Sequence, residues 1–467
     1  MNKPLQEDLD SLERIIQLVS GQGLNYLKAL HTRYTTADIR IPGQGALPQK
    51  GGGSIAALQL FNQRWESAMV AASGPRYWGF VTGGTTPAAI AGDWLATVYD
   101  QNTQTAKGEG DLSAAIELET IGLLRELLNL PECFLGGFVT GATMSNFTCL
   151  AVARQWLGNQ QGTDIAKQGI TQQLPVLTAT PHSSSVKSLA MLGMGSGNII
   201  TVNTLQPNRE AIDIRDLEAK IRALNGQPFI LISSAGTVNT VDYDDFAAIA
   251  ALRSHYNFWW HIDAAFGGFA ILSETHQHLL KDWEQADSIT VDCHKWLNVP
   301  YESAVFLIRE QHRLLQVTAF QNSNAPYLGD PLESFNYLNL LPENSRRLKA
   351  LPAWFTLMAY GRDGYKQIIE ESIRLAQIFG AFVASRPELQ LLAPVRLNTV
   401  CFTLTAGNAE RVAAFLSALN QTGKVFMTPT LYKDQPGIRA TFVNFRTTEA
   451  DVELVKALIL RLLPHYK

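Results

Sequence analysis

The sequence FWWHIDAAFGG at residues 258–268 decides the fold. Its first half is a short, largely apolar run of the kind that forms a buried strand, and Asp263 closes that run. Small residues follow the acid and leave room for a flat ligand to approach the backbone. A second apolar run at residues 288–291 is followed by Lys295. A carboxylate and an amine therefore follow two successive predicted strands.

The same pattern extends in both directions from this stretch. From about residue 60 to 310, helical stretches alternate with short apolar runs at 133–139, 174–179, 199–202, 229–233, 258–262, 288–291 and 304–308. This alternation predicts an α/β fold with a mainly parallel sheet that is covered on both faces. Because ligands bind at the carboxyl ends of the strands in such sheets, residues just after these runs are candidates for a site.

The chain is expected to divide into four parts. Residues 1–60 form an N-terminal helical segment, and the amphipathic spacing within 1–35 indicates a helix that needs a partner surface, such as a second subunit. Residues 61–320 form the large domain, and residues 321–344, rich in Asn, Pro and Gly, form a loop expected to act as a mobile lid. Residues 345–467 form a smaller α+β domain with strands at 398–404, 424–428 and 439–444 and helices at 409–419 and 449–463.

Composition excludes several classes of function. The net charge is −4 and both signs are interspersed, which argues against nucleic-acid binding and against a polybasic membrane surface. No run of about 18 apolar residues predicts a membrane-spanning helix, and the N-terminus is polar where a signal peptide would be apolar. The four cysteines are widely spaced, which favours reduced thiols. We expect a soluble cytoplasmic protein.

Each candidate site residue also has an ordinary interpretation. A strand-end acid such as Asp263 is equally typical of a helix cap, and a lone lysine is usually a solvated surface group. Residues 138–146 place small and hydroxyl side chains at the start of a helix, where backbone N–H groups bind phosphate, although such residues are also common N-caps. His182 follows another apolar run, and a lone histidine is more often a satisfied polar residue than a catalytic one.

Taken together, these features meet the demands of one cofactor, pyridoxal phosphate. That cofactor needs a lysine amine for its Schiff base and an anion cradle for its phosphate. It also needs a carboxylate beside its ring nitrogen, which Asp263 would provide, and His182 would supply a flat partner for the ring. No metal is required. Chance would rarely place all of these groups on successive strand ends of one sheet.

With these residues identified, the chain resembles the group II pyridoxal-phosphate decarboxylases of the aspartate-aminotransferase superfamily, which have fold type I. That family includes aromatic-amino-acid, histidine, glutamate and diaminobutyrate decarboxylases. The resemblance covers roughly residues 30–460. Its most specific motifs are residues 261–265 and 294–296, supported by residues 83–88, 140–143, 181–184, 345–347 and 444–448.

The resemblance implies a role for each site residue. Lys295 would form the Schiff base, Asp263 would pair with the ring nitrogen, and Ala265 and His182 would lie on the two faces of the ring. Ala142, Thr143 and His294 would hold the phosphate, with Thr237 as a weaker cofactor contact. The substrate would lie near Phe80, Thr82 and Thr85.

The resemblance also implies a homodimer with active sites at the subunit boundary and a tyrosine on the mobile loop that protonates the product. The loop holds Tyr327 and Tyr337, and the spacing back from Pro342 favours Tyr337. A packing role for Tyr337 is the alternative.

The implied reaction is the decarboxylation of an L-amino acid to the amine and CO2. The alternatives are another pyridoxal-phosphate reaction on the same scaffold, namely an aldehyde synthase, a carbon–carbon lyase or an aminotransferase, and a non-catalytic homologue. Trp78, Phe80 and Trp296 fit an apolar or aromatic substrate pocket, and they fit core packing equally well.

Overall fold

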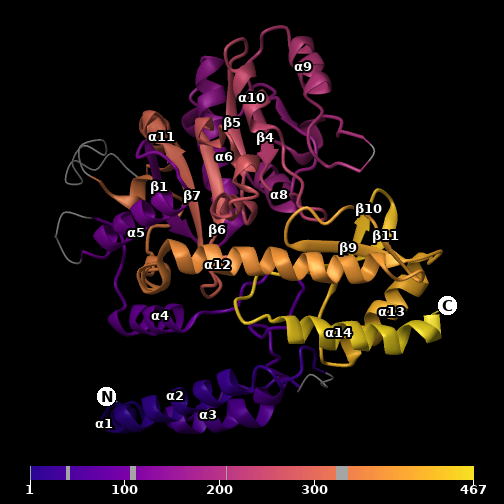
Figure 1. The fold of residues 1–467 in the computed structure, drawn as a ribbon. Coiled ribbons are helices and arrows are strands. Elements are labelled where there is room, and N and C mark those ends of the chain that lie inside the picture. The colour runs from indigo at the N-terminus through magenta and orange to yellow at the C-terminus, as the bar shows by residue number, and fades with distance from the viewer. Residues whose placement is uncertain (1, 38–42, 106–111, 207, 322–334, 467) are drawn as a thin grey trace.

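A seven-stranded sheet forms the centre of the molecule (Figure 1). The computed structural model describes residues 2–37, 43–105, 112–206, 208–321 and 335–466, and the strands run in the order β1-β7-β6-β5-β4-β2-β3. They are β1 Phe134–Val139, β2 Val176–Thr178, β3 Ile199–Thr201, β4 Phe229–Ser234, β5 Phe258–Asp263, β6 Ser288–Asp292 and β7 Ala304–Arg309. Each lies within two residues of the run that predicted it.

The pairing of these strands brings the candidate residues to one edge. β2 is parallel to β3 and β4, and β4, β5 and β6 are parallel in turn, whereas β7 is antiparallel to both of its neighbours. The prediction of a mainly parallel sheet is confirmed. In this register Asp263 lies beside Ser234 of β4 and Thr290 of β6. The carboxyl ends of β4, β5 and β6 are therefore adjacent.

Helices cover the sheet on both faces, which explains why its strands are apolar along their whole length. α6 (Ala142–Gln160) packs against β5, β6 and β7, and α8 (Ser183–Met191) packs against α6. α5 (Ser113–Leu127) packs against β1. The other helices of this region are α7 (Ile165–Gln168), α9 (Ile214–Ala223), α10 (Phe246–Leu252) and α11 (Arg313–Phe320).

A second, smaller sheet follows in the sequence. Its order is β10-β11-β9-β8, all antiparallel, with β8 Leu389–Leu391, β9 Thr399–Leu404, β10 Thr428–Tyr432 and β11 Gln435–Thr441. α13 (Ala409–Gln421) and α14 (Glu449–Leu462) flank it, and α12 (Ala350–Ala384) runs from the large sheet to the small one, with a kink at Gly361 (Figure 1). The smaller α+β unit was predicted correctly.

One predicted strand of the small sheet is wrong. Residues 424–428 were expected to pair within this sheet, but β10 begins only at Thr428. The preceding segment instead bonds to the chain near Trp78, because the Phe426 amide donates to the Arg76 carbonyl and the Trp78 amide donates to the Phe426 carbonyl. This segment therefore fastens residues 76–78 to the small unit.

The N-terminal helices stand apart from the body of the molecule (Figure 1). The predicted helix at 1–35 is two helices, α1 (Lys3–Asp10) and α2 (Leu12–Ala29), broken at Ser11, and α3 (Gly53–Arg64) lies against them. None of the three contains a buried residue. The apolar side chains they expose are Leu5, Leu9, Leu12, Ile16, Leu18, Val19, Leu24, Leu60 and Phe61. α4 (Pro87–Tyr99) follows and packs on α12.

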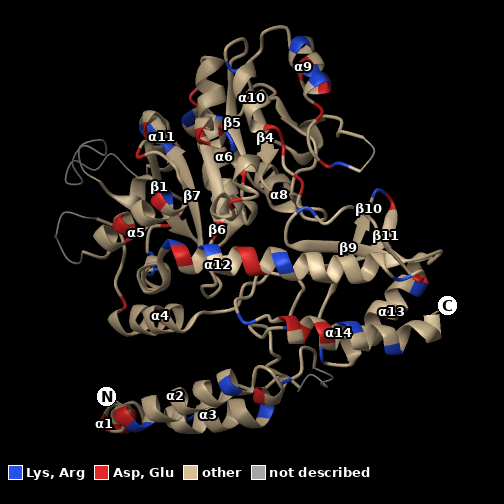
Figure 2. Ribbon diagram, in the orientation of Figure 1, with Lys and Arg blue, Asp and Glu red and all other residues tan. Residues whose placement is uncertain are grey.

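Charged residues of both signs occur along α9, α12 and α14 (Figure 2). Within the described ranges, no helix has the length and apolar character needed to cross a membrane.

Candidate active site

Most of the predicted site residues line one cavity of about 360 Å³ beyond the carboxyl ends of β4, β5 and β6. The predicted residues that line it are Phe80, Ala142, Thr143, His182, Thr237, Asp263, Ala265, His294 and Lys295. They come from the ends of β1, β2, β4, β5 and β6, or the segments just after them, and from one loop, so only the folded sheet brings them together. Among the described residues, no group of His, Cys, Asp or Glu side chains is arranged to hold a metal ion.

Lys295 projects from the turn that follows β6. Its Nζ lies 2.9 Å from Oδ2 of Asp292, the last residue of β6, and both side chains are largely buried. The backbone of this turn is held by Gly83, whose amide donates to the His294 carbonyl. A Cβ at Gly83 would lie only 1.8 Å from the Lys295 carbonyl oxygen, so no other residue fits there. The position of the lysine therefore depends on a segment more than two hundred residues earlier in the chain.

Residues from the C-terminal part fix the same turn from the other side. Asn298 is fully buried, and its Nδ2 donates to the Val443 carbonyl at 3.0 Å. The Phe445 amide in turn donates to Asn298 Oδ1 at 3.2 Å.

Asp263 ends β5 and is held as a carboxylate. Its Oδ2 accepts hydrogen bonds from Asn146 Nδ2 at 3.0 Å and from Ser185 Oγ at 3.2 Å, and its Oδ1 accepts from the Ala265 amide. Burial raises the pKa of Asp263, but the neighbouring His182 and Lys295, together with these hydrogen bonds, outweigh it and hold the pKa below its ordinary value. The group is therefore a fixed negative charge in the cavity.

His182 caps α8 and faces the same space. Its Nδ1 accepts from the Ser184 amide, and Ser184 Oγ lies 2.7 Å away. Burial lowers the pKa of His182, and the positive charges of Lys295 and Arg439 lower it further, although Asp263 opposes them. The ring is therefore neutral near pH 7 and can lie against a flat ligand.

The start of α6 also lines the cavity. Ala142 and Thr143 are the first residues of α6, where the backbone N–H groups have no partner within the helix. His294 Nδ1 and Asp292 Oδ1 form no hydrogen bond with the described residues and lie 3.5 Å from each other, and both residues line the cavity. The lysine, the carboxylate and this helix N-terminus are the groups that pyridoxal phosphate requires.

Of the three predicted substrate residues, one lines the cavity and two do not. Phe80 lines the cavity with an exposed ring, and it and Val81 both have positive φ near 57°, which is rare for non-glycine residues and typical of strained functional segments. Thr82 and Thr85 do not line the cavity. The Thr82 hydroxyl is bonded to the Tyr301 hydroxyl, and the Thr85 carbonyl accepts from Arg446. Trp78 and Trp296 are buried in core clusters.

Tyr337 does not lie where a proton donor would be needed. Its side chain is completely buried, its hydroxyl donates to the Gly136 carbonyl at 3.1 Å, and it is not among the residues that line the cavity. Burial raises the pKa of Tyr337 well above its ordinary value. The prediction that Tyr337 is the catalytic tyrosine therefore conflicts with its position, and the packing alternative fits. Tyr327 lies outside the described residues, as does most of the predicted loop.

Two charged residues of the cavity were missed from the sequence. Arg439 comes from β11 in the small sheet, and its Nη1 donates to the Val238 carbonyl. No local pattern marks an arginine in the middle of a strand. Asp292 was visible as the polar end of its strand, three residues before Lys295, and this spacing could have identified it.

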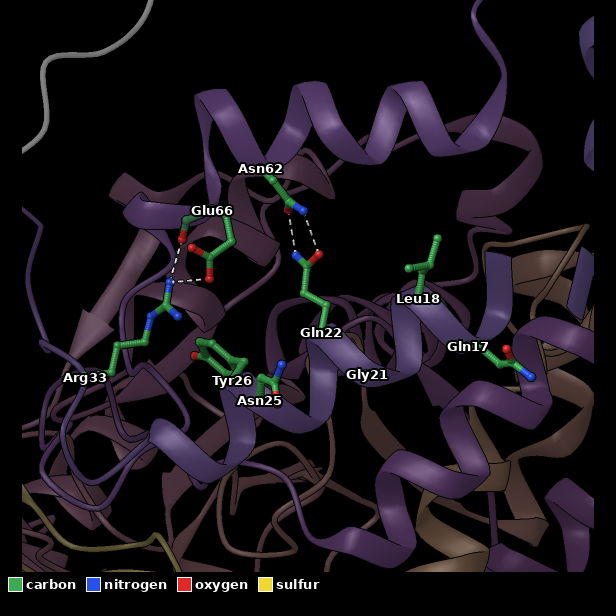
Figure 3. Close-up of a pocket in the computed structure, with 9 residues that line it drawn as sticks. All are labelled: Gln17, Leu18, Gly21, Gln22, Asn25, Tyr26, Arg33, Asn62 and Glu66. Carbon is green, nitrogen blue, oxygen red and sulfur yellow. Dashed lines mark hydrogen bonds and ion pairs between the residues drawn. The ribbon is translucent and has the colours of Figure 1, made fainter. Parts of the chain in front are cut away.

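A larger hollow of about 600 Å³ lies between α2 and α3 (Figure 3). The figure shows Gln22 paired with Asn62, and Arg33 paired with Glu66, across it. It contains no lysine and no free carboxylate pair, so it does not provide the chemistry of the cavity around Lys295.

Comparison with known proteins agrees with this geometry. Residues 62–405 match the model of the pyridoxal-dependent decarboxylase conserved domain. The chain is 27% identical to aromatic-L-amino-acid decarboxylase of Bacillus atrophaeus over 87% of its own length and 85% of the relative. It is 28% identical to L-2,4-diaminobutyrate decarboxylase of Rhizobium meliloti (strain 1021), over 86% and 80% of the two chains. The solved structure of Oryza sativa TDC with PLP and tryptamine shares the fold, with a TM-score of 0.90 at 21% identity, and the match covers 100% of this chain and 99% of that one.

Proposed function

The chain belongs to the pyridoxal-dependent decarboxylase family, and from that premise we propose how its residues divide the reaction. The protein is a pyridoxal-phosphate-dependent carboxy-lyase that converts an L-amino acid to the corresponding amine and CO2. The observation that carries the proposed roles is that Lys295, Asp263 and His182 line a single cavity.

Four residues are assigned to the cofactor ring. Lys295 would attach the cofactor covalently through Nζ, and Asp263 would accept a hydrogen bond from the ring nitrogen. His182 and Ala265 would lie on either side of the ring, and the neutral state of the His182 imidazole favours this contact. Bound pyridoxal phosphate supplies an electron-accepting ring for the electron pair left when the carboxylate departs. A fixed negative charge at Asp263 keeps that ring nitrogen protonated.

The phosphate is assigned to the start of α6. Ala142 and Thr143 offer backbone N–H groups and the positive end of the helix dipole, and His294 completes the cradle. Thr237 also lines the cavity, but its hydroxyl donates to Glu210 and its amide to the Asp242 carbonyl, so it borders the cofactor without donating to the phosphate. Burial lowers the pKa of His294, so its ring is neutral near pH 7 and binds through a hydrogen bond rather than a charge.

Arg439 is assigned to the carboxylate of the substrate. It lines the cavity together with His182 and Lys295, and a guanidinium binds a carboxylate through two parallel hydrogen bonds. Its Nη1 is already bonded to the Val238 carbonyl, which orients the group. Arg439 would thus set which bond of the substrate breaks.

Lys295 is assigned the return of the proton to the product. Asp292 Oδ2 lies 2.9 Å from Nζ, and this contact orients the Lys295 side chain whenever it is not joined to the cofactor. Tyr337 is buried outside the cavity, where its hydroxyl bonds to the Gly136 carbonyl. Among the described residues that line the cavity, Lys295 is the lysine, and its side chain is assigned to return the proton.

For the substrate we propose an L-amino acid with an apolar or aromatic side chain. Phe80, Val81, Pro181, Val238 and Phe266 give the cavity apolar walls. The test is to incubate the purified enzyme with each amino acid and measure CO2 and amine. Release from aromatic amino acids supports the proposal, whereas turnover confined to charged side chains contradicts it. Aldehyde and hydrogen peroxide in place of amine would identify an aldehyde synthase.

We also propose a homodimer joined through the N-terminal helices. A hydrogen-bonded pair, Gln22 and Asn62, joins α2 to α3, and an ion pair between Arg33 and Glu66 joins the residues just after these helices (Figure 3). The apolar faces of both helices are exposed in the single chain. Such a face is stabilised when a second copy covers it. Light scattering should give twice 51.4 kDa, and the Leu9→Glu/Ile16→Glu variant should give a single chain. A single-chain mass for the active parental protein contradicts the dimer.

A cytoplasmic location is proposed because all four cysteines are free, which is usual in reducing compartments. The division at residues 60, 320 and 344 is proposed as the domain organisation, and limited proteolysis should cut near these positions first if it holds.

A further inference from the structure

His261 is a buried histidine for which the reaction above has no use. It lies two residues before Asp263 on β5, its side chain is completely buried, and both ring nitrogens have polar partners. We propose that His261 is a positioning residue that holds the Asn146 amide in the one orientation that donates to Asp263. The inference rests on the proposed role of Asp263 toward the cofactor ring nitrogen.

The hydrogen bonds form a continuous chain that ends on the carboxylate. Ser288 Oγ lies 2.9 Å from His261 Nδ1, and His261 Nε2 lies 2.9 Å from Asn146 Oδ1. Asn146 Nδ2 lies 3.0 Å from Asp263 Oδ2. At the far end, Trp259 Nε1 donates to Ser288 Oγ at 2.9 Å.

The carboxylate fixes the direction of every donor in this chain. An ionised carboxylate only accepts, so the –NH2 group of Asn146 must face Asp263 and its carbonyl must face His261. His261 therefore donates from Nε2, and in the neutral ring Nδ1 accepts from the Ser288 hydroxyl. The Trp259 indole can only donate, so it completes the series in the same direction. A reversed Asn146 would place its carbonyl oxygen against a negative charge.

Because these groups are buried, the loss of any of their hydrogen bonds should be destabilising. His261, Asn146 and Ser288 are each fully buried, so water cannot replace a missing partner. Burial also lowers the pKa of His261 to about 4, which keeps the ring neutral with one donor and one acceptor.

The same amide also connects the two sides of the site. Asn146 Nδ2 lies 3.0 Å from Ser184 Oγ and 3.2 Å from Ser185 Oγ, both in the first turn of α8, which His182 caps. Rotation of Asn146 would therefore disturb Asp263 and the helix that carries His182 together. Without His261, nothing among the described partners holds the Asn146 carbonyl.

The experiment compares His261→Leu, which removes both polar atoms, with His261→Gln, whose side chain can still donate and accept. The readout is the 15N chemical shift of the ring nitrogen in holoenzyme loaded with 15N-labelled pyridoxal phosphate, together with kcat and KM. In the Leu variant the shift should move toward the unprotonated value and kcat should fall about tenfold or more with little change in KM. The Gln variant should recover most of both.

Two further variants keep the result decisive. Asn146→Leu should reproduce the His261→Leu effect, and it serves if His261→Leu does not fold. Asp263→Asn tests the proposed function itself, and an unchanged ring-nitrogen signal there would reject that function. A signal that moves in Asp263→Asn but stays unchanged in the His261 and Asn146 variants would overturn only the role of His261. Equal loss in the Gln and Leu variants would also overturn it.

Discussion

Two of the buried charged clusters beside the central sheet can be compared, because only one of the two faces the cavity. The lysine cluster consists of Asp263, Asp292, His294 and Lys295, and all four line the cavity. The arginine cluster consists of Glu117, Arg346 and Tyr337, and none of them does. Arg346 is more completely buried than Lys295, so burial of a charge does not by itself mark a catalytic group.

The arginine cluster instead fixes the backbone of β1, the strand that precedes the cavity-lining start of α6. Arg346 bonds to Glu117 at 2.6 Å and to the Phe138 carbonyl at 2.7 Å, and the Phe138 amide donates to Glu117 Oε1. The Tyr337 ring lies 4.3 Å from the guanidinium carbon. Because α6 begins only four residues after Phe138, this cluster fixes the strand that leads into the phosphate side of the cavity. The comparison separates residues that react from residues that hold the frame.

The largest expected effect is in the lysine cluster. Lys295→Ala should lower turnover by about a thousandfold or more and abolish the near-visible absorbance of bound cofactor, because the covalent attachment is lost. Lys366→Ala, an exposed lysine paired with Glu274, is the matched control and should change neither. Parental absorbance and turnover in Lys295→Ala would reject the assignment.

Asp263→Asn should bind the cofactor and lose about a hundredfold in kcat, since an amide cannot keep the ring nitrogen protonated. Asp287 is a matched buried carboxylate that pairs with His312 and Arg253 away from the cavity. Asp287→Asn should reduce stability and leave kcat of the folded fraction unchanged. Steady-state kinetics and urea unfolding measure both, and near-normal kcat in Asp263→Asn would mean that another acid has the role.

In the arginine cluster the largest effect should be on stability. Arg346→Met leaves Glu117 buried without its partner and should cost about 3–5 kcal/mol of unfolding free energy. Adding Glu117→Gln should recover part of that loss in a double-mutant cycle by urea unfolding. A drop in activity of the folded enzyme without loss of stability would place this cluster in the reaction instead.

Stability should also fall in acid. The folded pKa of His261 is lowered to about 4 by burial, whereas an unfolded histidine titrates near 6.5, so the unfolded state binds the proton first as pH falls. His261 should therefore contribute a loss of roughly 2 kcal/mol between pH 7.5 and pH 5.0. Urea unfolding at both pH values measures it. His261→Gln has no such titration and should show a smaller difference, and an equal difference in both proteins would contradict the assignment.

Tyr337→Phe should have the smallest effect. It removes one buried hydrogen bond, to the Gly136 carbonyl, and should cost about 1 kcal/mol with turnover within about twofold. Product analysis should find amine alone. Aldehyde and hydrogen peroxide from this variant would restore the catalytic role that its position argues against.

The difference between the two clusters also explains what the sequence could reveal. Asp263 and Lys295 follow apolar strands of one parallel sheet, so their meeting follows from local pattern and sheet geometry. Arg439 enters the cavity from the second sheet, and no spacing along the chain predicts that approach. Tyr337 was assigned through its neighbours in sequence, whereas its side chain is held in the core by Gly136 and Arg346. Local pattern identifies strand ends, but not the packing that closes a site from another part of the chain.

The bonds from Asn298 to Val443 and Phe445 have a consequence for biosynthesis. The turn that carries Lys295 is complete only when the segment around Val443 has been translated and has reached it. At about 5–20 residues per second, the ribosome needs roughly 7–30 s to travel from the lysine codon to that segment. During this interval the nascent sheet holds a reactive amine whose final position is not yet fixed. Cofactor capture should therefore follow synthesis of the segment around Val443, and ribosome-bound chains that end before Val443 should not retain it.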